Sequence, residues 1–133
     1  MFCGIVAGVK VEDKIWEDEE FLAVLDINPC CRGHLLVIPK KHSRWVWDMG
    51  KEEYLRYMDK IYYLASVLRK VFETDCVQMA IVGMDVVHSH VHLLPRVEGD
   101  GFAGIPVTPM MPKLSDEEMI EIRDKIKNAF WVC

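Results

Sequence analysis

The sequence lacks any apolar run close to the roughly 20 residues that a membrane-spanning helix requires, so we expect no membrane span. It also lacks an excess of basic residues: 16 Lys and Arg stand against 21 Asp and Glu, and the formal charge is −5. Because duplex nucleic acid is bound by clustered Lys and Arg, we expect a small molecule or a protein as partner instead. The start of the chain lacks the basic stretch and apolar block of a secretory signal, which predicts a cytoplasmic protein.

The cysteines do not indicate a disulfide framework. There are five of them, an odd number, and in a protein that we expect not to be exported they are predicted to be reduced thiols. The chain has 133 residues, about half of them apolar, which is the size and composition of a single domain with one core.

Short apolar runs and one amphipathic segment predict the main elements of the fold. The runs predict strands at Phe21–Ile27, Leu35–Pro39, Val77–Val82 and about Val86–Pro95. Apolar residues at three- and four-residue steps predict a helix from Glu52 to Phe72. These elements predict an α+β fold: a small antiparallel sheet of about five strands with one long helix packed on it.

A break in regular structure separates these elements from a second helix. Glycine and proline interrupt residues Gly99 to Lys113. Ser115 and Glu118 then have the spacing of a capping box, which predicts the start of a C-terminal helix. We therefore expect a main domain over residues 1–98. Residues 99–133 are predicted to form a tether and a helix that packs on the same domain or on a partner subunit.

Three histidines, His88, His90 and His92, stand at alternate positions of the fourth predicted strand, where they would share one face. Core packing explains them poorly, because each ring has two nitrogens that need partners. A metal is one functional interpretation. However, His88 and His92 would start roughly 13 Å apart, whereas ligand atoms on one Zn²⁺ lie within about 4.2 Å of each other. Phosphoryl chemistry fits better, because neutral imidazole is a nucleophile and its neighbours can donate hydrogen bonds to phosphate oxygens.

The segment from His88 to Leu94 resembles the H-φ-H-φ-H-φ-φ signature of the histidine-triad (HIT) family of nucleotide-binding hydrolases and transferases. Two upstream stretches, LDINP at 25–29 and GHLLVIPKKH at 33–42, resemble the family's other characteristic block. The resemblance covers roughly residues 2 to 98, and it is to the short-loop branch of Hint-type hydrolases.

The resemblance implies a reaction at the α-phosphate of a purine nucleoside phosphoramidate or a dinucleoside polyphosphate. His90 would attack the phosphorus and form a nucleotidyl-histidine that water then resolves. The backbone carbonyl of His88 would hold the ring of His90, and His92 would contact phosphate oxygens or the leaving group. His34, in the position of a fourth family histidine, would complete the cluster around His88.

The resemblance also implies a nucleoside site. Asp26 would accept hydrogen bonds from the ribose hydroxyls, which are two donors that one carboxylate can accept together. The apolar slot for the base would be formed by Phe2, Ile5, Leu25 and Ile27. A second interpretation of Asp26 remains open, since a carboxylate at the end of a strand can instead cap the turn at Asn28–Pro29.

The sequence departs from the family pattern in two places. Met84 stands where many members have a glutamine that assists the leaving group, so a non-catalytic nucleotide-binding module remains the alternative to an enzyme. Some relatives hold a structural zinc with two N-terminal cysteines and two histidines. This sequence has Cys3, His42 and His88 but not the first cysteine, and we expect no cofactor and no metal in the active site. Three ligands and a water could still bind zinc.

The family typically forms homodimers, which the resemblance implies for this chain. The helix at 52–72 offers one interface, because Tyr54, Tyr57, Tyr62 and Tyr63 give it more aromatic surface than one core face requires. Ordinary core packing explains part of that set equally well.

Overall fold

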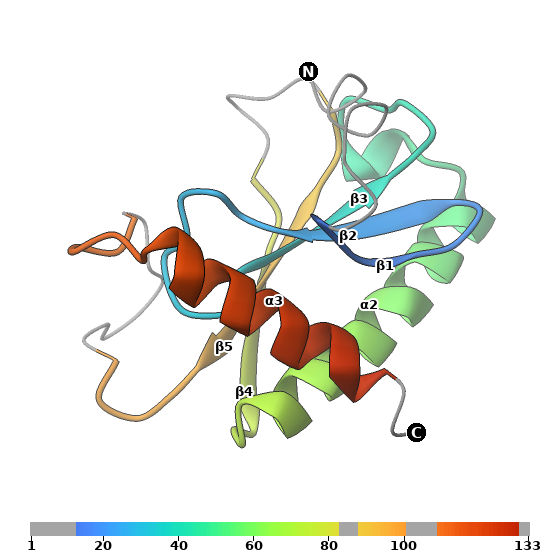
Figure 1. The fold of residues 1–133 in the computed structure, drawn as a ribbon. Coiled ribbons are helices and arrows are strands. Elements are labelled where there is room, and N and C mark those ends of the chain that lie inside the picture. Colours follow the sequence, from blue (N-terminus) through green and yellow to red (C-terminus); the bar gives the residue numbers. More distant parts are fainter. Residues whose placement is uncertain (1–12, 83–87, 101–108, 131–133) are drawn as a thin grey trace.

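The computed structural model describes residues 13–82, 88–100 and 109–130, and its centre is an antiparallel sheet of five strands in the order β1-β2-β3-β5-β4 (Figure 1). The strands are β1 (Lys14–Glu17), β2 (Phe21–Leu25), β3 (Leu35–Pro39), β4 (Cys76–Ala80) and β5 (Val91–Arg96). The helices are the short 3-10 helix η2 (Val46–Asp48), α2 (Lys51–Val71) and α3 (Asp116–Ala129). The predicted α+β class, with a small antiparallel sheet and one long helix packed on it, is confirmed.

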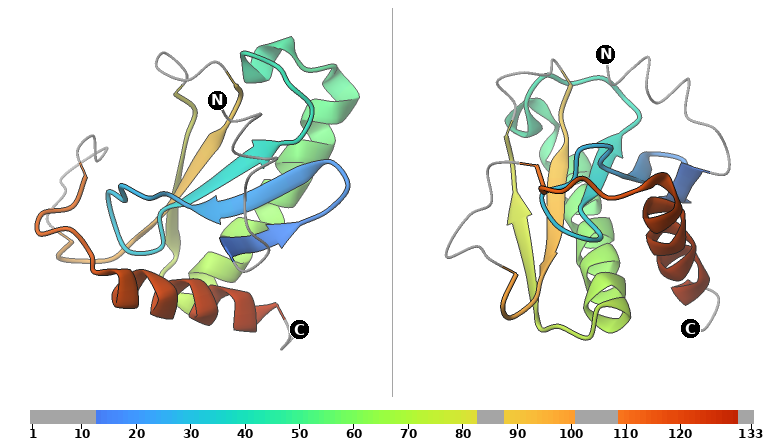
Figure 2. Two further views of the ribbon diagram at one scale, coloured as in Figure 1. Left: turned by 45° about the horizontal axis from the view of Figure 1, so that its top comes forward. Right: turned by 60° about the vertical axis from the view of Figure 1, so that its left-hand side comes forward.

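Helix α2 runs along one face of the sheet (Figure 1, Figure 2). Because side chains alternate along a strand, every second residue of β3 faces this helix. Leu35 and Val37 of β3 are fully buried in the core that α2 closes. The intervening residues, Leu36 and Ile38, form a small separate apolar cluster on the opposite face. Among the described residues, no helix is long and apolar enough to cross a membrane.

Two contacts tie strand β3 to helix α2. The hydroxyl of Tyr57 donates a hydrogen bond to the carbonyl of Val37, and the same ring stacks on Phe21 with centroids 5.0 Å apart. Gly33, the second residue before β3, has a φ of +83°, and a Cβ at this position would collide with the ring of Phe72. Glycine is therefore required here, both for its backbone conformation and for the close approach of the end of α2.

Helix α3 begins with the predicted capping box. The Oγ of Ser115 accepts from the backbone N of Glu118 at 3.1 Å, and the Glu118 carboxylate accepts from the backbone N of Ser115 at 3.1 Å. Ile122 and Ile126 are buried in the same core as α2, so the helix packs on its own chain. It lies beside α2 and β1 (Figure 2).

The structure differs from the sequence-based expectation at two strands. Strand β1 was not predicted. The first two residues of the strand predicted from Val86 lie outside the described residues; in the described part strand β5 begins at Val91, and the backbone N of Ser89 donates to the carbonyl of Ser43 at 2.7 Å instead of pairing with β3. Tyr57 is wholly buried, so core packing accounts for this member of the tyrosine set.

The burial of α3 predicts unequal effects for two isoleucines on the same helix. Ile126 is 1% exposed and Ile120 is 46% exposed. Ile126→Ala should lower the free energy of unfolding by about 2–4 kcal/mol, because it leaves a cavity in the core. Ile120→Ala should change it by less than about 0.5 kcal/mol. Urea denaturation of both variants tests this, and equal effects would show that α3 does not pack as described.

Candidate active site

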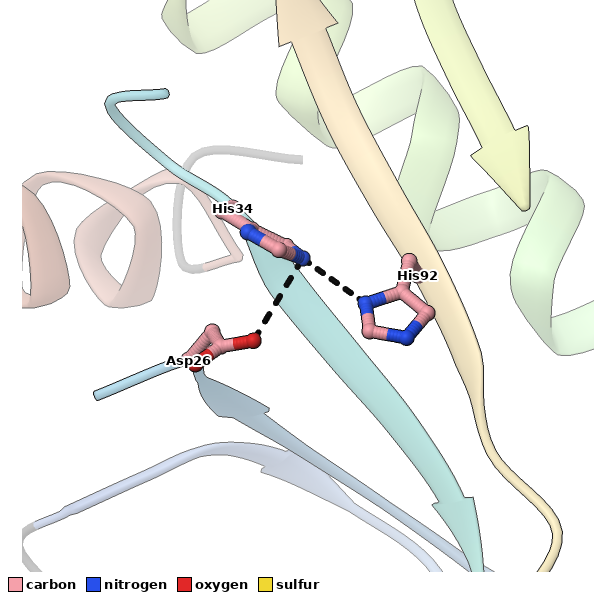
Figure 3. Close-up of side chains that lie close together, drawn as sticks. All are labelled: Asp26, His34 and His92. Carbon is pink, nitrogen blue, oxygen red and sulfur yellow. Dashed lines mark hydrogen bonds and ion pairs between the residues drawn. The ribbon is translucent and has the colours of Figure 1, made fainter. Parts of the chain in front are cut away.

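The candidate site lies on the face of the sheet opposite α2. Leu36 of β3 pairs with His92 of β5 and with Val24 of β2, and directly opposed residues share a face. His34 is two residues from Leu36 along the chain, and Asp26 is two residues from Val24, so both side chains fall on this face as well. Figure 3 shows the result: Asp26 at the end of β2, His34 at the start of β3 and His92 on β5 point toward one another.

His90 has its ring fixed by the backbone. Its Nδ1 lies 3.0 Å from the carbonyl oxygen of His88, and its ring meets that of His92 edge to face with centroids 4.9 Å apart. A carbonyl can only accept, so Nδ1 carries the proton, and Nε2 of the neutral ring carries the lone pair. The contact that the resemblance implied between the His88 carbonyl and His90 is therefore present.

His34 is almost fully buried, 3% exposed, and both of its ring nitrogens have partners. Its Nδ1 accepts a hydrogen bond from the backbone N of Cys30 at 3.0 Å, and its Nε2 lies 2.8 Å from Nδ1 of His92. Because an amide N–H can only donate, Nδ1 of His34 has no proton and Nε2 must carry it. His34 therefore donates to His92.

Asp26 is held in place at the end of β2. Its backbone N donates to the carbonyl of His34 at 2.9 Å, which extends the pairing of β2 with β3 by one bond. Its Oδ1 accepts from the backbone N of Asn28 at 2.8 Å, and its Oδ2 lies 3.6 Å from Nε2 of His34. The turn that we considered as an alternative role is thus present, but it occupies one oxygen and leaves the other facing the histidines.

Burial keeps these histidines uncharged. Desolvation, together with the neighbouring rings of His90 and His34, lowers the pKa of His92 to about 4, although the carboxylate of Asp26 acts in the opposite direction. Burial also lowers the pKa of His34 and of His88. At neutral pH the rings of His34, His88 and His92 are therefore neutral hydrogen-bond donors and acceptors.

His88 anchors the segment that carries His90. Its Nε2 donates to the carbonyl of Pro39 at 2.7 Å, and its ring packs edge-on against His42 with centroids 5.1 Å apart. The next residue, Ser89, is held by Ser43 through both its backbone N and its hydroxyl. These contacts attach the segment to the chain just after β3 and so fix the carbonyl that orients His90.

A family model matches most of this chain and so identifies its family. Residues 7–99 match the model of the HIT domain. The chain belongs to the HIT family. An uncharacterized HIT-like protein of Methanocaldococcus jannaschii is 36% identical over 105 residues, which are 76% of this chain and 81% of that protein. The adenylylsulfatase HINT3 of Arabidopsis thaliana is 30% identical over 75% of this chain and 53% of its own length. The crystal structure of a zinc-bound HIT protein from Mycobacterium smegmatis is 29% identical, with a TM-score of 0.73 over 99% of this chain and 96% of that one.

One contact in this HIT protein corrects the sequence-based prediction. His34 was expected to complete a cluster around His88, but it contacts His92, while the described neighbour of the His88 ring is His42. The reason is the register of the sheet. His34 directly precedes β3 and lies diagonally across from His92 of β5, whereas His88 precedes β5 and lies near the far end of β3.

The residues proposed for the base slot fall in different places. Leu25 pairs with Leu35 and packs against the core on the α2 side, because it is one residue from Asp26 on a strand. Val24 lies on the face of Asp26 and was missed, although alternation along the strand would have found it. Ile27 is 77% exposed. Phe2 and Ile5 lie outside the described residues.

One described cluster has the ligand types of a metal site. Asp26, His34 and His92 each offer an atom within 4.8 Å of the other two, and a carboxylate with two imidazoles suits divalent transition metals. However, Nε2 of His34 carries the proton that it donates to His92 at 2.8 Å. Ligand atoms of a tetrahedral zinc lie about 3.4 Å apart. A metal would have to displace that proton and separate the rings, so the cluster fits a hydrogen-bonded pair better than a metal ion.

The structural zinc site considered in the sequence analysis would use other residues, namely Cys3, His42 and His88. Nε2 of His88 is bonded to the Pro39 carbonyl, so only its Nδ1 could serve as a ligand beside the neighbouring ring of His42. Cys3, the third ligand type, lies outside the described residues, as does Met84. Zinc on these three residues therefore stays a prediction.

The lowered pKa values make the fold sensitive to mild acid. The unfolded chain takes up protons on histidine near pH 6.5, whereas the folded chain does so on His92 only near pH 4. Stability should therefore be fully present above about pH 6.5 and fall as the pH drops toward 4. Urea midpoints at pH 7 and pH 5 measure this. A His92→Gln variant should show a smaller loss, and an unchanged wild-type midpoint would contradict the burial described.

Proposed function

We propose that the protein is a nucleotide hydrolase or transferase that cleaves at the α-phosphate of a purine nucleoside phosphoramidate or dinucleoside polyphosphate. Membership of the HIT family supports the broader class, a nucleotide-binding hydrolase. The observation that carries the proposal is the hydrogen bond between Nδ1 of His90 and the carbonyl of His88, because it leaves the lone pair on Nε2.

The reaction has two steps. In the first, Nε2 of His90 forms a bond to the α-phosphorus, and the bond from phosphorus to the leaving group breaks, with the electron pair going to the leaving group. In the second, the oxygen of a water attacks the same phosphorus, the bond to Nε2 breaks with its electron pair returning to that nitrogen, and the proton that the water loses passes to solvent. The N–H that His92 retains on Nε2 lies on the neighbouring ring and donates to phosphate oxygens as charge develops.

Asp26 gives the site its preference for a ribonucleotide. Its Oδ2 is not used by the turn at Asn28 and accepts hydrogen bonds from the ribose hydroxyls. We expect the apolar surface for the base to include Val24, which lies on the face of Asp26, and the exposed Ile27; the proposal thus replaces Leu25 with Val24. Phe2 and Ile5, which the resemblance implied, lie outside the described residues. The name of the Arabidopsis relative, an adenylylsulfatase, supports hydrolysis at an adenylyl group.

Replacement of His90 tests the proposal. His90→Ala should lower kcat on adenylyl substrates by at least about 1,000-fold, since a nucleophile is lost, while AMP affinity changes by only a few-fold. The remote variant Ile120→Ala is the control for folding, and the assay contains a chelator. Normal turnover by His90→Ala would contradict the proposed mechanism.

Two further results of the same assay distinguish the alternatives. Tight AMP binding without cleavage of any substrate by the wild type would instead indicate the non-catalytic module. Activity that the chelator removes would indicate a zinc-dependent hydrolase.

The ribose role of Asp26 can be separated from its role in the turn. Asp26→Asn keeps an oxygen for the backbone N of Asn28 but removes the charge, and it should weaken AMP binding by about 10-fold or more. Removal of the 2′ and 3′ hydroxyls should weaken binding to the wild type by a similar factor, with little further loss in the variant. Calorimetric titration measures all four affinities, and independent, additive losses would disprove the contact.

We also propose that the protein is a homodimer that uses the outer face of α2. Leu55 and Tyr62 are seven residues apart on one face of this helix and are 54% and 77% exposed. Sedimentation should give a particle of twice 15.4 kDa, and Tyr62→Ser should shift it toward the monomer. A wild-type monomer at micromolar concentration would refute this assembly.

A further inference from the structure

The connection between β2 and β3, residues 26–34, carries Asp26, and a distant part of the chain contacts it from outside. The backbone N of Asp26 donates to the carbonyl of His34 at 2.9 Å, and its Oδ1 accepts from the backbone N of Asn28 at 2.8 Å. The residues of this connection belong to no strand. Their position depends on contacts with residues 110–118, which we call the supporting segment and which pass beside the connection into α3 (Figure 2).

The backbone of Met110 makes the first of these contacts. Its N donates to the carbonyl of Pro29 at 2.8 Å. Pro29 is buried, and a buried carbonyl without a donor is costly. The side chain of Met110 packs against the main core, which also contains Leu114, so the donor is anchored. Pro109 and Pro112 flank Met110 and further restrict the backbone there.

The side chain of Glu118 makes the second contact. Its Oε2 accepts from Nη2 of Arg32 at 2.8 Å, while its Oε1 accepts from the backbone N of Ser115 in the capping box. The Ser115 amide and then the Arg32 guanidinium lower the pKa of Glu118, so this carboxylate is charged at neutral pH. Both side chains are exposed, and such an ion pair adds little to the free energy of folding. It does attach the connection to the first turn of α3.

We propose that the supporting segment sets the affinity of the site for ribonucleotides, because it holds the connection where Asp26 can meet both ribose hydroxyls. The inference rests on the proposed role of Asp26. Without these contacts the connection would adopt more conformations, and a nucleotide would have to order it on binding, which costs conformational entropy. The coupling is reciprocal: a ribonucleotide bound to Asp26 favours the same arrangement of Met110 and Glu118.

The predicted effect is specific to the ribose. A nucleotide without the 2′ and 3′ hydroxyls makes no hydrogen bond to Asp26, so its affinity should not depend on where that carboxylate lies. Any change that reaches the phosphate through His34 would weaken the binding of both nucleotides alike. The ratio of the two affinities therefore isolates the ribose contact from a general loss of structure.

Two substitutions of Met110 separate the backbone bond from side-chain packing. Met110→Pro removes the N–H toward Pro29, so the Kd of AMP should rise about fivefold, the effect of one hydrogen bond, and that of 2′,3′-dideoxyadenosine 5′-monophosphate by less than about twofold. Met110→Ala keeps the N–H and loses packing, so it should lower the free energy of unfolding but leave both Kd values within about twofold. Calorimetric titration measures the affinities. Equal weakening of AMP by both variants, or of both nucleotides by Met110→Pro, would overturn the proposal.

The ion pair provides a milder variant that decides the question if Met110→Pro does not fold. Glu118→Gln keeps a capping residue at the third position of α3 but removes the charge that faces Arg32. The Kd of AMP should rise about twofold, and Arg32→Ala should give the same rise, with no further loss in the double variant. Glu117→Gln removes the same charge from an exposed neighbour and is the matched control. An equal rise in the control, or additive losses in the double variant, would refute the coupling.

Hydrogen exchange of the wild-type protein tests the reciprocal effect. AMP and its dideoxy analogue, each at the same multiple of its own Kd, stabilise the whole fold equally. AMP should nevertheless slow exchange of the Met110 amide by at least about threefold more than the analogue does. Equal slowing would overturn the coupling. A wild type that binds both nucleotides equally well would refute the ribose role in the proposed function and the inference with it, whereas a preference for AMP that Met110→Pro retains would refute the inference alone.

Discussion

Backbone hydrogen-bonding groups determine where the protons of the site's histidines lie. The carbonyl of His88 can only accept, so it fixes a proton on Nδ1 of His90 and leaves the lone pair on Nε2. The amide of Cys30 can only donate, so it has the opposite effect on His34 and, through that ring, on His92. In the proposed mechanism, neighbouring rings of the same residue type thus act as a nucleophile and as a hydrogen-bond donor.

The fold provides these two backbone groups by local departures from the sheet. Strand β5 begins at Val91, and the residues just before it, held by Ser43 through Ser89, direct the His88 carbonyl toward Nδ1 of His90. On the other side, Gly33 allows the chain to enter β3 through a turn that brings the amide of Cys30 to the His34 ring. The sheet itself contributes the common face on which His34 and His92 meet.

The elements predicted well from the sequence are those with local signals. The bounds of α2 were one residue off at each end, β3 was predicted as found, and the capping box at Ser115 started α3 as expected. Strand β1 has only four residues and a single buried one, Ile15, so its pattern was too short to recognise.

The errors concern contacts between segments that are distant in the sequence. The partner of His34 depends on how β3 pairs with β5, and the start of β5 depends on a bond from Ser89 to Ser43. Neither can be read from spacing. The choice of Leu25 over Val24 was different, because the alternation of side chains already placed Val24 on the face of Asp26.

The account requires that Nε2 of His90 attacks phosphorus, and trapping the covalent state tests this most directly. Wild-type protein mixed with an adenylyl substrate and quenched at neutral or alkaline pH within milliseconds should gain the mass of one adenylyl group. Fragmentation should locate that group on His90. Turnover of the substrate with the adduct on another residue, or with no adduct at any time point, would contradict the account.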